Sequence, residues 1–129
     1  MLCVITALAS FTINSEASAS EAFCTYHSSE NIDSWVSDGL ALAGLPDTPY
    51  WHSVLKNQAW IESGFIPDIV NTSDANFALG HPSTGLEQVE VEAWDFTYLG
   101  SLFPFAECAD DPVVSVSVRA ELFALGYFN

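Results

Sequence analysis

The chain has 129 residues, 17 of them acidic and only two basic (Lys56 and Arg119), for a formal net charge of −15, and we expect one domain spanning residues 1–129. Two basic residues are too few to neutralise nucleic-acid phosphates or to hold an anionic membrane surface, so the composition excludes both classes of partner. A hydrophobic content of 50% also excludes a disordered acidic chain.

The first part of the chain predicts a β-hairpin. Residues 2–13 alternate loosely between two faces, which is typical of a half-buried strand, and residues 17–26 alternate again after a turn. The apolar start lacks the positive region of a signal peptide, because no basic residue precedes Lys56. No apolar run approaches the ~18–20 residues that span a bilayer.

Two neighbouring helices are predicted next. A serine, Ser28 or Ser29, is placed to cap the first helix, and Gly44 is placed to end it. The second helix begins with Thr48 as the cap and Pro49 at the first helical position, and the following Ser-Gly pair ends it. The connection between them is short, so the helices should pack side by side.

Residues 66–111 predict a loop, a strand and a second loop. Residues 66–85 are rich in Pro, Gly, Asn and Asp, and a loop of that length is usually a functional or interaction segment. Residues 86–99 predict a strand whose apolar face reverses halfway, as a bulge near Ala93–Trp94 would produce. A second loop is expected over residues 100–111.

Residues 113–128 carry the clearest strand signal, because Val114, Val116 and Val118 alternate with polar residues. Strands at both ends and a helical pair between them predict an α+β fold, with an antiparallel β-sheet and two adjacent helices packed on one face. A mainly β sandwich with a helical insertion is the alternative.

The cysteines and histidines do not form a recognisable metal site. Cys3, Cys24 and Cys108 are odd in number and lack a C-x-x-C pair, which argues against zinc and against a disulfide framework. Each is expected to be a small buried side chain, and a Cys24–Cys108 bridge is left open. The three histidines lack metal-binding spacing and are expected to be surface or hydrogen-bonded residues.

Carboxylates are the only abundant reactive groups, and they form two clusters. Glu87, Glu90 and Glu92 lie on the predicted strand and are expected to form a solvated acidic face. The second cluster comprises Glu107, Asp110 and Asp111. It is the only candidate Ca²⁺ site, although it lacks the regular spacing of a calcium loop, and no other cofactor is expected.

The segment Phe103-Pro104-Phe105 in the second loop is the candidate interaction site. Exposed, it would be an adhesive patch that fits a pocket in a neighbour, and the alternative is a loop folded onto its own core. Few charges and high apolarity also favour protein neighbours, in a homo-oligomer or a larger assembly.

The sequence holds no catalytic motif, so the leading hypothesis is a non-enzymatic structural subunit of a larger assembly, such as a virion capsid, decoration or tail component. A virion or extracellular location is favoured over the cytoplasm. One alternative is a small secreted Ca²⁺- or carbohydrate-binding module. The other is an α+β enzyme with a carboxylate-based cleft, because two nearby carboxylates can carry glycoside hydrolysis.

Overall fold

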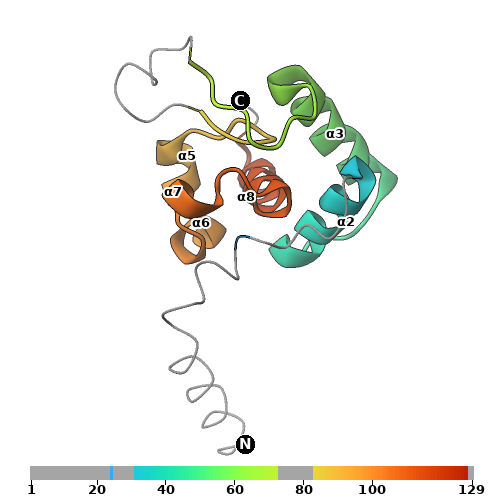
Figure 1. Ribbon diagram of the computed structural model, residues 1–129. Coiled ribbons are helices and arrows are strands. Elements are labelled where there is room, and N and C mark those ends of the chain that lie inside the picture. The colour runs from blue at the N-terminus through green and yellow to red at the C-terminus, as the bar shows by residue number, and fades with distance from the viewer. Residues whose placement is uncertain (1–23, 25–30, 73–82, 128–129) are drawn as a thin grey trace, which may run out of the picture.

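A computed structural model shows a helical protein, of which residues 24, 31–72 and 83–127 are described (Figure 1). The helices of these residues are α2 (Ile32–Ala43), α3 (Pro49–Ser63), α5 (Val91–Phe96), α6 (Tyr98–Leu102), α7 (Phe105–Cys108) and α8 (Pro112–Ala124). In this part of the chain, β pairing is limited to two isolated antiparallel bridges, Val70–Thr84 and Thr84–Val89. The predicted antiparallel β-sheet is therefore wrong, and so is the β-sandwich alternative.

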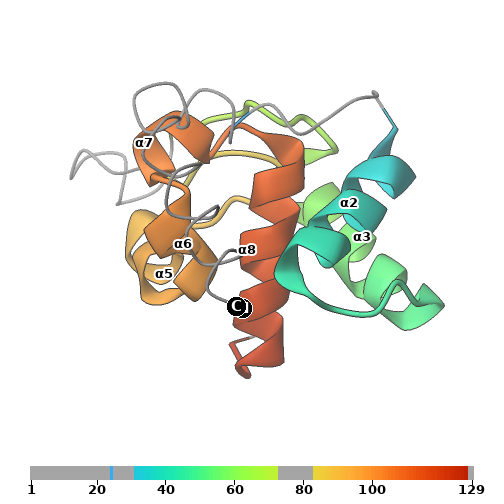
Figure 2. The same ribbon diagram turned by 90° about the horizontal axis from the view of Figure 1, so that it is seen from below.

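Helix α8 is the centre of the fold. Figure 2 shows it lengthwise, with α2 and α3 on one side and α5, α6 and α7 on the other. Every residue from Pro112 to Ala120 is buried. One hydrophobic cluster joins Val113 and Val116 to α2 and α3, and a second joins Val114 and Val118 to Trp94 and the short helices.

The strand predicted over residues 113–128 is wrong because α8 is covered on all sides. A helix without a solvent face has no polar stripe, so its 3.6-residue period is hidden and alternating valines imitate a strand. Its interior serines are hydrogen-bonded, since Ser117 Oγ donates to Val114 O (2.8 Å) and Ser115 Oγ accepts from Glu87 N (3.0 Å).

The sequence did contain the start signal of α8. Asp111 is its N-cap, and Asp111 Oδ1 accepts hydrogen bonds from the main-chain nitrogens of Val113 (3.0 Å) and Val114 (3.1 Å). Pro112 follows at the first helical position, where its missing N–H costs nothing. An Asp-Pro pair of this kind indicates a helix start more strongly than β-branched residues indicate a strand.

The predicted helical pair is confirmed. Gly44 ends α2 in a left-handed conformation, and Thr48 caps α3 ahead of its first-turn proline. The start of α2 differs from the prediction, because Asn31 rather than Ser28 or Ser29 is its cap.

The strand over residues 86–99 and the loop over residues 100–111 are also wrong, since α5, α6 and α7 occupy most of these segments. The apolar face of residues 86–99 reverses in the sequence because this segment forms short helices that pack around the buried Trp94, not because a strand carries a bulge. Trp94 is fully buried, and its Nε1 donates to Phe103 O at 2.7 Å. Thr97 ends α5 and caps α6, which turns the chain between them.

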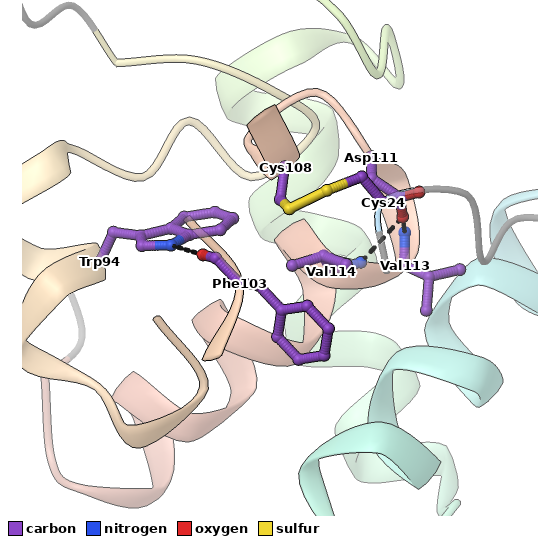
Figure 3. The surroundings of a disulfide bond; sticks show 7 residues. All are labelled: Cys24, Trp94, Phe103, Cys108, Asp111, Val113 and Val114. Carbon is purple, nitrogen blue, oxygen red and sulfur yellow. Dashed lines mark hydrogen bonds between the residues drawn. A yellow bond between two sulfur atoms is a disulfide. The ribbon is translucent and has the colours of Figure 1, made fainter. Parts of the chain in front are cut away.

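A disulfide joins Cys24 to Cys108 at the end of α7 (Figure 3). The bridge lies beside the capped start of α8 and near Trp94. It ties together positions 84 residues apart in the sequence. The bridge that the sequence left open is therefore present, and these two cysteines are not isolated buried thiols.

Several predictions fall outside the described residues. These are the strand over residues 2–13, nearly all of the strand over residues 17–26, and the positions of His27 and His81. Within the described residues, none of the helices is long and apolar enough to cross a membrane.

Candidate functional site

The described ends of the long loop between α3 and α5 pair with each other. Asn71 N donates to Ser83 O at 2.9 Å, and Gly85 N donates to Ile69 O at 2.8 Å. These bonds, with the two isolated bridges, hold residues 69–71 beside residues 83–85. The pairing brings the end of α3 and the start of α5 to one surface above α8.

That surface holds a pocket of about 320 Å³, here called the polar pocket. It is lined by Glu62, Asn71, Ser83, Gln88, Val89, Glu90, Ala93 and Arg119. Two carboxylates, a guanidinium, two side-chain amides and a hydroxyl thus meet on one concave surface. Convergent polar groups in a cleft are typical of a binding or catalytic site.

Gln88 is held in a strained conformation at this pocket. Its φ of 50° lies in the left-handed region that residues other than glycine rarely adopt. The side chain is buried, and its Nε2 donates to Ile69 O and to Gly85 O, both at 3.0 Å. Backbone strain that is held in place by surrounding hydrogen bonds, as at Gln88, is found most often at functional sites.

Glu87, which precedes Gln88 of the pocket lining, is fully buried, which corrects the prediction of a solvated acidic face at this residue. Neither oxygen of its carboxyl group has a hydrogen-bond partner among the described residues. Burial raises the pKa of Glu87 well above its ordinary value, with Arg119 opposing the shift and Glu62 adding to it. Glu90 and Glu92 are exposed, as predicted.

Arg119 is the buried positive charge of the site, with 4% of its surface exposed. Its Nη2 donates to Glu87 O at 2.8 Å, which ties the segment before α5 to α8. Burial lowers the pKa of Arg119, and the negative charges of Glu87, Glu62 and Glu90 oppose that shift. One guanidinium therefore faces three carboxyl groups, two of which line the pocket.

A second pocket, here called the aromatic pocket, has a volume of about 450 Å³. It is lined by Glu90, Glu92, Ala93, Phe96, Leu122, Gly126 and Tyr127. Because Glu90 and Ala93 line both pockets, the two are neighbours along α5.

The predicted Ca²⁺ ligands do not converge on one point. Asp111 uses one carboxyl oxygen to cap α8, and Glu107 and Asp110 are exposed. Asp110 and Asp111 line a third pocket with Asp68, of about 340 Å³, which Glu107 does not reach. Among the described residues, no three His, Cys, Asp or Glu side chains are grouped to hold a metal. The Ca²⁺ site stays a prediction.

The predicted interaction segment lies mostly against the protein's own core. Phe103 is buried, and Phe105 is half-buried with its ring 5.5 Å from that of Trp94. Pro104 is the exposed residue of the three. A partner at this segment would therefore meet Pro104 and the edge of Phe105 rather than Phe103.

His52 takes part in a polar network between α2 and α3, as expected for a hydrogen-bonded histidine. Its Nε2 lies 2.6 Å from Asp47 Oδ1 and 3.2 Å from Ser37 Oγ, and its Nδ1 lies 3.6 Å from Asp33 Oδ1. A hydrogen bond from Lys56 is the main cause of a lowered pKa at Asp33. The network therefore joins α2, α3 and the connection between them.

No protein-family model matches the chain, and neither the curated proteins nor the solved structures give a match. The sequence singled out Glu90 within an acidic cluster but missed the other charged residues of the polar pocket, Glu62 and Arg119. Arg119 could have been recognised from the sequence, because it interrupts the apolar run that forms α8. A charged residue in such a run is rarely buried without a partner, so its position indicates a buried and paired charge. Nothing local to Glu62 distinguishes it from an ordinary helix-surface glutamate.

Proposed function

We propose that the protein is an enzyme that cleaves glycosidic bonds, with Glu62 and Glu90 as its catalytic carboxyl groups. The observation that carries the proposal is the polar pocket, where carboxyl groups from two separate elements line one cleft above the buried Arg119. Most glycosidases use a pair of carboxyl groups that flank the scissile bond.

The two carboxyl groups receive different roles from their positions. Glu62 belongs to α3, a regular helix of 15 residues, whereas Glu90 is the N-cap of the six-residue α5. We assign to Glu62 the proton transfer to the leaving glycosidic oxygen. Glu90 stabilises the positive charge on the anomeric carbon or deprotonates the attacking hydroxyl group.

The remaining lining supports the binding of a sugar. Asn71 and Ser83 supply an amide and a hydroxyl group that match the hydroxyl groups of a carbohydrate. Gln88 supplies only its carbonyl oxygen as an acceptor, because both N–H bonds of its amide are directed to main-chain oxygens. The side chain of Gln88 is already fixed by its two hydrogen bonds, so it loses little conformational entropy when a ligand binds.

The test is a screen of purified protein against β- and α-linked polysaccharides, with the products identified by mass. We expect cleavage of at least one of them, and loss of that cleavage in Glu62→Gln. Product masses show whether water or a hydroxyl group of the sugar attacked the anomeric carbon. Cleavage of none of them would contradict the proposal, and binding without cleavage would favour the carbohydrate-binding module.

The structural subunit favoured by the sequence remains the second candidate. Its support is the exposed apolar side chains of α3: Tyr50 near its start is 67% exposed, and Trp60 and Ile61 near its end are 62% and 75% exposed. Light scattering after size-exclusion chromatography tests it, since a monomer that persists at high protein concentration contradicts an assembly. The disulfide supports an extracellular or virion location for either candidate, because such bonds persist in oxidising surroundings.

A further inference from the structure

We infer that the aromatic pocket is a sugar-binding subsite that continues the polar pocket, so that the protein binds a glycan chain several sugars long. This inference rests on the proposed function. The inference adds the place where the rest of the glycan chain binds and the residues that hold it. Phe96 and Tyr127 form the surface on which a sugar ring stacks.

The first argument is the exposure of the two rings. Phe96 is 60% exposed and Tyr127 is 51% exposed, although both lie beside the buried Leu122. Their centroids are 5.2 Å apart with an angle of 69° between the rings. In a T-shaped pair the edge of one ring covers one face of the other ring, and the exposure of both side chains leaves the remaining ring faces open to a ligand. The negative face of an aromatic ring attracts the C–H groups on the apolar side of a pyranose.

The second argument is continuity with the polar pocket. Glu90, the N-cap of α5, is followed at three-residue spacing by Ala93 and Phe96, so each of these residues is a neighbour of the next, and all three line the aromatic pocket. Six residues of helix span about 9 Å, which is longer than one pyranose ring. Ala93, which lines both pockets, has a small side chain and does not block a ligand that runs between them.

The third argument is the mixed chemistry of the pocket. Glu90 and Glu92 supply hydrogen-bond acceptors at one side, while Phe96, Leu122 and Tyr127 supply apolar surface at the other. A purely apolar partner would leave the two carboxylates desolvated, which is costly. A pyranose meets both requirements, because its ring edge carries hydroxyl donors and its ring face carries C–H groups.

The test measures binding of β-1,4-linked N-acetylglucosamine oligomers, a dimer and a hexamer, by calorimetry. All proteins carry Glu62→Gln so that the hexamer is not cleaved. We expect the hexamer to bind at least tenfold more tightly than the dimer. Adding Phe96→Ala should remove most of that advantage, and Phe96→Trp should retain it. Tyr98→Ala is the matched control, since Tyr98 is 70% exposed and lies outside both pockets.

Three results would overturn the inference: no binding of the hexamer, equal affinity for both oligomers, or an unchanged hexamer affinity in Phe96→Ala. Melting temperatures of all variants show whether each is folded. A failure of the proposed function has a different signature, because wild-type protein would then bind the hexamer through Phe96 without cleaving it.

Discussion

Gly39 of α2 lies directly against Val116 of α8. A methyl group built at Gly39 would lie 2.5 Å from Val116 Cγ1 and 3.0 Å from Val113 O, which is closer than non-bonded atoms approach. Both residues are fully or almost fully buried at this helix crossing. The absence of a side chain at Gly39 therefore sets how closely α2 approaches the central helix.

Gly39→Ala should destabilise the protein. Overpacking of a tight core contact costs about 1–3 kcal/mol, which opposes the gain of about 1 kcal/mol in helix propensity. Chemical denaturation measures the net loss. The same substitution in a Val116→Ala background should cost less, because the shorter side chain makes room, and strict additivity of the two substitutions would contradict a direct contact.

The stability of the protein should fall as the pH rises above 4.5, the ordinary pKa of Glu87. Because the pKa of buried Glu87 is raised, the folded state retains a proton that the unfolded state releases, so the unfolded state gains stability relative to the folded one. Glu87→Gln removes this dependence and should stabilise the protein by about 1–3 kcal/mol at pH 7. Denaturation from pH 4 to pH 8 measures it. The exposed Glu107→Gln serves as the control, and parallel pH profiles of wild type and Glu87→Gln would contradict the assignment.

Removal of Arg119 should be strongly destabilising. Arg119→Met leaves Glu87 O without its donor and removes the cation that faces three carboxyl groups, so we expect a loss of about 3–5 kcal/mol. Arg119→Met should cost less in a Glu87→Gln background than in the wild type, because no ionisable carboxyl group is then buried beside the position that the guanidinium leaves. An equal cost of Arg119→Met in the wild-type and Glu87→Gln backgrounds would show that the two side chains act independently.

Reduction of the Cys24–Cys108 bridge should lower stability by about 4 kcal/mol, since the bond closes a long loop in the unfolded chain. Thermal unfolding with and without a thiol reductant measures the effect. The double variant Cys24→Ser, Cys108→Ser should melt at the lower temperature and should not respond to reductant. A wild-type melting temperature that reductant does not change would contradict the bridge.

Sequence reasoning succeeded where local rules decide the structure. The Thr48–Pro49 start of α3 and the Gly44 end of α2 follow from hydrogen bonding at helix termini, and both are present. It failed for α8, because burial on all sides removes the polar stripe that distinguishes a helix from a strand. The N-cap at Asp111 indicated a helix and should have counted against the strand that the alternating valines predicted.

The candidate site was harder to predict because long-range packing assembles it. Glu62, Asn71 and Arg119 come from three separate segments, and no short motif joins them. Glu87 was expected in water because acidic residues are seldom buried without a partner. The fold places it inside, where Arg119 holds its main chain and the carboxyl group itself has no hydrogen bond from the described residues.

The most direct test of the account is the rate of glycan cleavage by Glu62→Gln, with Glu107→Gln as the matched control for the loss of one exposed acidic side chain. If Glu62 transfers the proton, its variant should lose at least about 100-fold in kcat, while its melting temperature stays at the wild-type value and the control keeps full activity. A Glu62→Gln protein that cleaves glycans at the wild-type rate would contradict the account.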